Sequence, residues 1–196
     1  MQEGVDALDR VLIVSGSEKS MQTIAQFLNA YGYDSMTCAV SGSEARRLVQ
    51  TVDYAMIVIH TPLTDEFGHE LAIALAEKTS AGILLLCKAD IADDVADSVS
   101  DYGVCVIARP ISRALLHQSI RLLEATRSRV LSLKRENARL MTRIDEMRLI
   151  GRAKCALMEH MQLSEPEAHR YIEKQAMDTR ATRKEVARQI LAELSG

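Results

Sequence analysis

The residues whose types could do chemistry together are a thiol and an imidazole, Cys87 and His60, each at the end of an apolar run. In doubly wound sheets, sites gather at the carboxyl ends of neighbouring parallel strands. A catalytic thiol also needs a base, an orienting third group and an oxyanion site. The sequence contains no phosphate-binding glycine loop, no G-x-S-x-G and no H-E-x-x-H. A buried thiol beside a loop histidine is therefore the favoured interpretation, and we expect neither enzyme activity nor a cofactor.

Cysteine and histidine spacing predicts no metal site, because neither residue type shows a metal-type pattern. The first ten residues are acidic and polar and do not resemble a secretory signal, so we expect reduced thiols in the cytoplasm. The longest apolar runs, Ala55 to Ile59 and Ile83 to Cys87, are too short to cross a bilayer, so no membrane is expected. The four cysteines are Cys38, Cys87, Cys105 and Cys155.

Charge is unevenly distributed along the chain, although the net charge is only −3. Residues 1–117 hold 8 Lys and Arg against 16 Asp and Glu, whereas residues 118–144 hold 7 against 2. Residues 145–196 hold 9 of each. A basic segment behind an acidic half suggests a polyanion partner. A solvated basic helix face explains the same charge equally well.

The first half of the chain predicts an α/β scaffold for these residues. The composition, 47% hydrophobic and 26% charged, is that of a globular protein. Apolar runs alternate with helical stretches, and the runs are apolar at consecutive positions, as parallel strands buried on both faces require. Right-handed connections then give a flavodoxin-like, doubly wound, five-stranded parallel sheet. The predicted strands are residues 11–15, 35–39, 54–60, 82–87 and 104–108, and the predicted helices are 17–30, 43–51, 65–78 and 92–101.

Pro62 follows the third predicted strand, and Arg109–Pro110 follows the fifth. With these residues and matching element lengths, residues 9–125 resemble a response-regulator receiver domain, a module of signal transduction. In that family two acids after the first strand bind Mg²⁺, and an aspartate ending the third strand takes the phosphoryl group. A Ser or Thr follows the fourth strand and a Lys-Pro pair the fifth. Hard oxygen ligands suit Mg²⁺, and a carboxylate supplies the nucleophile.

The chain departs from this family pattern at nearly every position. Valine cannot accept a phosphoryl group, and a Ser-Gly pair supplies no anionic ligands for a divalent ion. A register shift of two residues would place His60 at the acceptor position, which is not an acid either. We therefore predict a degenerate pseudo-receiver that is not phosphorylated on aspartate and is controlled otherwise, by a regulatory sensor protein or by expression level. The degenerate positions are Ser15 and Gly16 for the acidic pair, Val58 for the acceptor, Cys87 for the hydroxyl and Arg109 for the lysine.

One long helix is predicted from Arg113 to about Met161, and its middle carries a heptad pattern. Spacings of three and four alternate, which keeps one apolar seam facing a partner helix. Asn137 at an a position fixes register and favours two strands, because each amide is satisfied by its mate. We predict a coiled-coil homodimer over residues 126–150; the alternative is a helix packed along its own domain. The a positions are Leu123, Val130, Asn137, Ile144 and Gly151, and the d positions are Thr126, Leu133, Leu140 and Met147.

Residues 145–196 predict a small three-helix all-α domain. Ser164 with Glu167, and Thr182 with Glu185, form capping boxes that mark the starts of two helices after the long one. Their apolar residues recur at helical spacing, and Tyr171 is interpreted as core. The methionines interpreted as core are Met158, Met161 and Met177.

Five short blocks in this region carry a family resemblance: Ala153–Lys154, Leu157–Met158, Ser164–Glu165 with Ala168, Ala176–Met177 and Glu185–Val186–Ala187. Their ungapped spacing resembles an ANTAR domain, the RNA-binding module of transcription antitermination, over residues 140–194. A pseudo-receiver, a coiled coil and this module form an architecture known in that family. The resemblance implies a bacterial regulator that binds paired RNA hairpins in leader transcripts as a dimer and stabilises an antiterminator.

Basic side chains are the natural RNA contacts, because Arg and Lys bind phosphates while planar groups stack on splayed bases. Lys154 matches the family motif directly, and Lys174 stands where family members often carry a basic residue. The others are chosen from charge alone, and a solvated face explains each of them as well. The predicted RNA-binding residues are Lys154, Arg152, Arg170, Lys174, Arg180, Arg183 and Lys184.

Two other functions remain open at the level of sequence. The terminal helices could form a DNA-binding helix-turn-helix, but the connection lacks a glycine-containing turn and the last helix offers few recognition residues. Alternatively, the pseudo-receiver and coiled coil could form a signalling scaffold that binds proteins alone.

Overall fold

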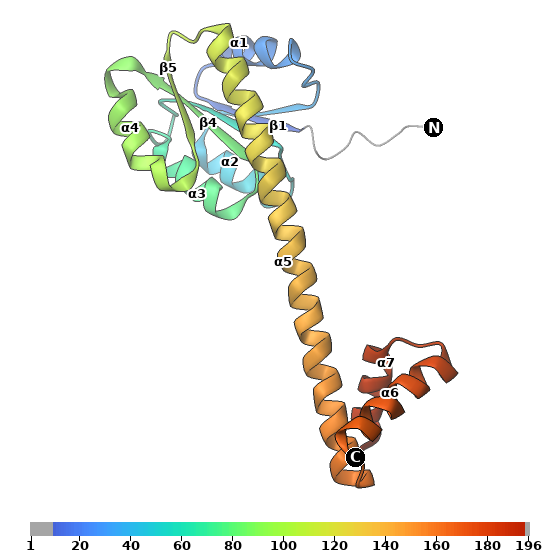
Figure 1. Cartoon of the computed structure of the whole chain (residues 1–196). Coiled ribbons are helices and arrows are strands. Elements are labelled where there is room, and N and C mark those ends of the chain that lie inside the picture. The colour runs from blue at the N-terminus through green and yellow to red at the C-terminus, as the bar shows by residue number, and fades with distance from the viewer. Residues whose placement is uncertain (1–9, 195–196) are drawn as a thin grey trace. The chain divides into compact units, whose positions relative to one another are not determined.

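The computed structural model describes residues 10–194, and the chain divides into two compact units, Met1–Ser132 and Leu133–Gly196 (Figure 1). Residue 9, where the predicted receiver begins, and residues 195–196, where the predicted module ends, lie outside the described residues. The division falls inside one continuous helix. The finer subdivision into residues 9–125, 126–150 and 145–196 stays a prediction.

The first unit contains a five-stranded parallel sheet in the order β2-β1-β3-β4-β5. This order reverses direction at β1, as in flavodoxin-like doubly wound folds, and confirms the predicted fold class. The boundaries agree with the predicted ones to within two residues, and those of β1 agree fully. The strands are β1 (Val11–Ser15), β2 (Met36–Ala39), β3 (Met56–His60), β4 (Gly82–Lys88) and β5 (Cys105–Arg109).

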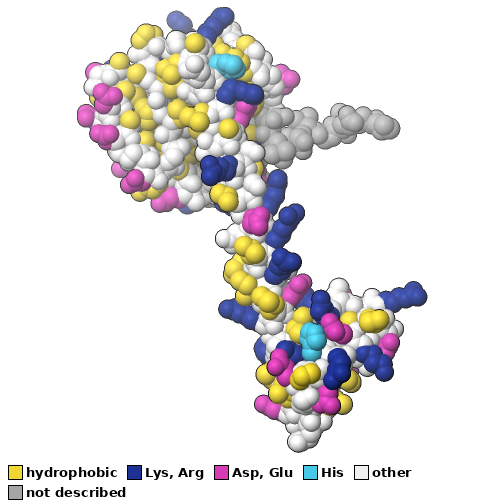
Figure 2. Space-filling model, in the orientation of Figure 1, with side chains coloured by type: hydrophobic (Ala, Val, Ile, Leu, Met, Phe, Trp, Pro, Cys, Tyr) yellow, Lys and Arg dark blue, Asp and Glu magenta, His cyan; other side chains and the backbone are white. Residues whose placement is uncertain are grey.

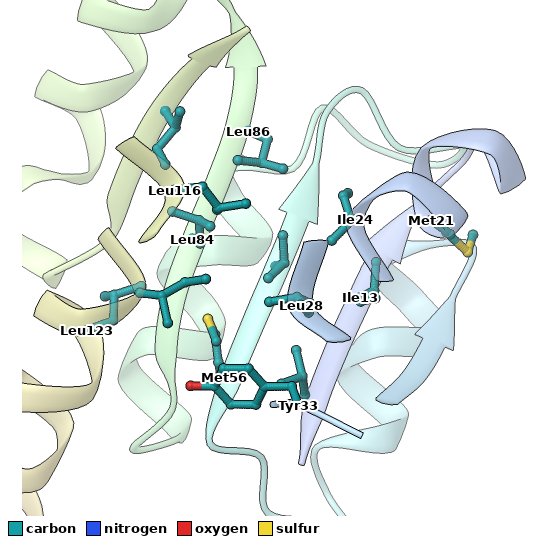
Figure 3. Packing of buried hydrophobic residues seen from close by; sticks show 14 residues of the cluster. Ile13, Met21, Ile24, Leu28, Tyr33, Met56, Leu84, Leu86, Leu116 and Leu123 are labelled. Atoms are coloured by element: carbon teal, nitrogen blue, oxygen red, sulfur yellow. The ribbon is translucent and has the colours of Figure 1, made fainter. Parts of the chain in front are cut away.

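Helices cover both faces of the sheet, because alternate residues of each strand point to opposite sides. On β3, Met56 and Val58 join a cluster with α1 and the start of α5, whereas Ile57 and Ile59 join a cluster with α2, α3 and α4. Figure 3 shows the first cluster, with Leu28 of α1 facing the strands. The helices are α1 (Glu18–Asn29), α2 (Gly42–Leu48), α3 (His69–Lys78), α4 (Ala92–Val99) and α5 (Arg113–Met161), with short 3₁₀ turns η1 (Ala89–Ile91) and η2 (Ser100–Tyr102).

The start of α3 was predicted wrongly, because Asp65 does not begin that helix. Its carboxylate accepts hydrogen bonds from Gly42 N–H at 2.9 Å and from Ser43 N–H at 3.0 Å, so it caps α2 from a distant loop. These donors hold the pKa of Asp65 down at about 2. A carboxylate at a helix N-terminus satisfies orphan amide groups and the helix dipole. Asp65 does stabilise a helix N-terminus, but the helix is α2 and not the predicted α3.

The beginning of α5 belongs to the core of the first unit. Leu116, Ile120 and Leu123 are buried in the first cluster, and a side chain at Gly82 would approach Leu123 Cβ to 2.9 Å. The prediction that Leu123 belongs to a dimer seam is therefore wrong, because its side chain is already buried on the sheet. The exposed apolar residues further along α5 begin at Val130.

The second unit packs the end of α5 against α6 (Glu165–Thr179) and α7 (Arg183–Leu194). Its core centres on Ala153, Leu157 and Ile172, with Tyr171 packed at its margin. The predicted capping boxes are present: Glu167 accepts from Ser164 N–H at 2.8 Å, and Glu185 accepts from Thr182 N–H at 2.8 Å. The fold prediction of a long helix followed by a small helical domain is confirmed.

The three methionines predicted as core are instead exposed, with Met158 at 38%, Met161 at 47% and Met177 at 79%. The core is formed by other positions of the same helices, such as Ala153, Leu157 and Ile172, and helical spacing alone does not show which face is buried. Among the described residues, none of the helices combines the length and the apolar composition that crossing a bilayer requires.

Candidate functional site

Three polar side chains meet at the carboxyl edge of the sheet in the first unit. The register of β1 and β3 places Ser15 beside His60, and Arg109 reaches across β4 from the end of β5. An arginine N–H always donates, so Arg109 NH1, 2.8 Å from His60 Nε2, requires a lone pair on that nitrogen. The imidazole proton is therefore on Nδ1, 3.3 Å from Ser15 Oγ. His60 is neutral in this arrangement.

This network occupies both ring nitrogens of His60. Burial and the charge of Arg109 lower the pKa of His60, so the ring stays neutral, but Ser15 and Arg109 occupy both of its nitrogens. The Cys87 side chain is fully buried, and burial raises the pKa of its thiol. A catalytic thiol needs a lowered pKa and a base within hydrogen-bond reach. The pKa of the Cys87 thiol is raised instead.

The side chain at the predicted phosphoacceptor position is apolar and packs in the hydrophobic core. Val58 is fully buried in the first cluster. Gly16 faces the loop after β3 so closely that a side chain there would lie 3.0 Å from Thr64 Cγ2. The nearby acids are engaged elsewhere, Asp65 with the α2 N-terminus and Glu66 with Arg46. Within residues 10–194, no group of three or more His, Cys, Asp or Glu residues could hold a metal ion.

The second unit has a concave basic surface between the end of α5 and the α6–α7 connection. Its cavity measures about 960 Å³. Lys154, Arg183 and Lys184 line it, together with the apolar side chains of Ile144 and Met147. Figure 2 shows hydrophobic side chains beside Lys and Arg along the exposed part of α5. The structure thus brings together three of the seven predicted RNA-binding residues.

Each of these three basic residues has a carboxylate partner. Lys154 Nζ lies 2.7 Å from Glu165 Oε1, Arg183 lies 3.2 Å from Glu173, and Lys184 lies 3.9 Å from Glu146. The ammonium group of Lys154 lowers the pKa of Glu165. Exposed ion pairs of this kind contribute only about 0–1 kcal/mol each. They orient the basic side chains without preventing exchange of the carboxylate for another anion.

The other four predicted residues lie outside the cavity lining. Arg170 donates through Nε to Pro166 O at 3.3 Å within its own helix. Arg180 ends α6 in the left-handed conformation, with φ of 53°. Arg152 and Lys174 are exposed on their helices.

Sequence reasoning missed Arg143 and His169, which also line the cavity. Arg143 precedes Lys154 by eleven residues, about three helical turns, so the helical period places both on one face. That spacing could have identified Arg143 as a candidate RNA-binding residue from the sequence. No comparable signal exists for His169, because its position depends on how α6 packs against α5.

Comparison with solved structures assigns the first unit to a fold. A signal receiver domain of an HD domain-containing protein from Pseudomonas fluorescens Pf-5 matches with a TM-score of 0.58 and 16% identity, covering 67% of this chain and 97% of that one. A receiver domain protein from Clostridium thermocellum matches with a TM-score of 0.55 and 15% identity, covering 63% and 99%. The first unit has the fold of response-regulator receivers.

Sequence comparison relates the second unit to a known domain family. Residues 138–191 match the family model described as the ANTAR domain. The transcriptional regulatory protein PdtaR of Mycobacterium tuberculosis, strains CDC 1551 and H37Rv, is 28% identical over 186 residues, covering 94% of this chain and 90% of that protein. The chain thus joins a unit with the receiver fold to a segment that matches the ANTAR domain, and it is similar to a transcriptional regulator along nearly its whole length.

Proposed function

We propose that this protein is a transcription antitermination regulator that binds paired RNA hairpins as a homodimer, with a receiver domain that is not phosphorylated. The observation that carries the proposal is the concave basic surface of the second unit, which lies within the ANTAR match. The relative with similarity over nearly the whole chain is named as a transcriptional regulator, which supports the same class.

The basic side of this hollow suits the phosphates of an RNA loop. Leu140, Ile144 and Met147 of the predicted seam line its α5 side and would be covered by the partner helix in the dimer. The RNA contacts therefore fall to Lys154, Arg183 and Lys184. Lys154 has a side chain only 23% exposed, so it is held in place before RNA arrives. Because the ion pairs to Glu165, Glu173 and Glu146 are weak, RNA phosphates can replace the carboxylates.

The exposed apolar side chains of α5 support dimerisation. Leu133 is 62% exposed, Leu140 50% and Met147 66%, and with Val130 and Ile144 they follow the predicted heptad around Asn137. A row of exposed apolar residues at this spacing stabilises a helix pair when buried. A parallel pair would present two ANTAR modules, one for each hairpin of the RNA.

The loss of phosphorylation follows from the edge of the sheet in the first unit. Val58 offers no oxygen to a phosphoryl donor, and Ser15 is engaged with His60 and Ser17. A receiver of this kind is controlled by something other than aspartyl phosphate.

The experiment that tests the proposal measures binding of the full-length protein to a double-hairpin RNA and to duplex DNA of matched charge, over a range of salt concentrations. We expect the RNA to bind more tightly, and Lys154→Ala to weaken binding and reduce the salt slope by about one counterion. Lys78→Ala, which removes the same charge from an exposed position on α3, is the matched control and should change neither quantity.

Preference for the duplex would overturn the RNA assignment in favour of a DNA-binding regulator. Binding to neither nucleic acid would favour a protein-binding scaffold. Equal effects of Lys154→Ala and Lys78→Ala would remove the cavity from the binding site.

A further inference from the structure

We propose that the receiver-fold unit binds a small organic carboxylate with an apolar body, in a cavity between α1 and the β5–α5 connection. This cavity measures about 340 Å³, near the lower end of the range for small-molecule sites. It opens at the carboxyl edge of the sheet, where ligands bind in doubly wound folds. Nothing in the proposed RNA function requires such a site, so either proposal can fail without affecting the other.

The cationic end of the cavity is formed by Arg109. Its guanidinium has five N–H donors. NH1 donates to His60 Nε2 at 2.8 Å and NH2 to the Thr61 carbonyl at 3.0 Å, and both partners are neutral. Nε is buried and has no hydrogen-bond partner. Among the residues that the structure describes, no carboxylate forms an ion pair with Arg109.

An unneutralised guanidinium with an orphan buried donor is costly, because burial removes water from a charge that no protein anion compensates. A carboxylate ligand at the terminal nitrogens of Arg109 would supply the missing charge, since arginine and carboxylate form short, charge-assisted and often paired hydrogen bonds. Lys19 of α1 also lines the cavity and adds a second positive charge at its rim.

The rest of the lining is apolar and determines the kind of carboxylate. The lining includes Phe27 of α1 and Ile111 after β5, which are half-buried, beside Ile24, Leu116 and Val58, which are already buried. An inorganic anion would leave Phe27 and Ile111 in contact with water, whereas an aliphatic or aromatic chain would bury their exposed surface. The geometry therefore fits an amphipathic monocarboxylate with its head on Arg109 and its body against Phe27 and Ile111.

The test titrates the full-length protein with 3-phenylpropionate and octanoate, and with two comparison ligands, 3-phenylpropanamide and inorganic phosphate. Binding is followed by isothermal titration calorimetry and by amide shifts in two-dimensional NMR. We expect saturable binding of at least one carboxylate, with shifts that include Ile111 and Phe27. The neutral amide should bind at least tenfold more weakly, because it cannot neutralise Arg109.

Substitutions locate the site. Arg109→Gln should weaken carboxylate binding at least tenfold, whereas Arg47→Gln, an exposed arginine on α2, should leave it unchanged. Lys19→Gln at the exposed rim provides a second test that does not disturb the buried network. If Arg109→Gln does not fold, the comparison of acid with amide in the unaltered protein still measures the requirement for charge.

Three results would overturn the proposal: no saturable binding of either carboxylate up to about 10 mM, well above the range of specific small-molecule affinities; equal affinity for the acid and its amide; or phosphate binding as tightly as the carboxylates. None of these outcomes depends on whether the ANTAR module binds RNA, so failure here is distinguishable from failure of the RNA proposal.

Discussion

Replacing Leu133 by alanine should weaken a homodimer held by the α5 seam. Burying a leucine side chain completely contributes about 2 kcal/mol. Leu133 is 62% exposed in the single chain, so pairing could bury the remainder for about 1.2 kcal/mol per chain, or roughly 2.5 kcal/mol per dimer. The dissociation constant of the Leu133→Ala dimer should therefore rise roughly 60-fold.

Sedimentation equilibrium over a range of protein concentrations measures this constant directly. Leu122→Ala is the matched control, because Leu122 is also on α5 and is 64% exposed, but it precedes the exposed seam that begins at Val130. Pairing through the seam predicts little change for Leu122→Ala. A wild-type protein that stays monomeric at every concentration, or equal effects of the two substitutions, would refute the reasoning.

Three further predictions concern the receiver-fold unit. Incubation with acetyl phosphate and Mg²⁺ should leave the intact mass unchanged, because Val58 cannot accept a phosphoryl group. The pKa of Asp65 is lowered to about 2 in the folded protein. Its contribution to the free energy of unfolding is therefore present above its ordinary pKa near 4 and is lost as the pH falls toward 2. Asp65→Asn should remove this part of the acid dependence, measured by urea unfolding. His60 has a lowered pKa in the folded state, so the unfolded chain takes up its proton first; stability should fall as the pH drops below about 6.5, and His60→Gln should flatten that slope.

Each of these predictions has an outcome that contradicts it. A labile mass increase of one phosphoryl group would show that another residue takes the place of the missing aspartate. An unchanged acid limb in Asp65→Asn would mean that the carboxylate does not cap α2 in solution. A stability that is level from pH 7 to 5 in the wild type, measured beside Arg47→Gln as a control, would contradict the neutral state of His60.

Local sequence determined the elements of this protein, because their signals act over a few residues. Apolar runs such as 55–59 predicted buried parallel strands, and the order of strands and helices predicted the doubly wound sheet. The capping boxes at Ser164 and Thr182 predicted where two helices begin, since an N-cap interacts only with its own first turn. The long helix from Arg113 to Met161 was likewise predicted from its period.

Only tertiary structure decided which surfaces those elements share. The heptad pattern included Leu123, yet packing on the sheet buries it, because periodicity shows a helix face without showing what covers it. Asp65 was predicted at one helix and caps another, since a carboxylate binds whichever N-terminus the chain brings within reach.

The candidate sites depend on tertiary structure in the same way. The sequence singled out Lys154 by its motif, but the grouping of Lys154 with Arg183 and Lys184 around one cavity required the packing of three helices. It singled out His60 and Arg109 separately, from different strand ends. Their contact, the neutral imidazole and the orphan Nε of Arg109 arise because β3 and β5 lie two strands apart in a parallel sheet, a distance that an arginine side chain spans. Sequence determined which chemical groups are present, and the sheet decided which of them meet.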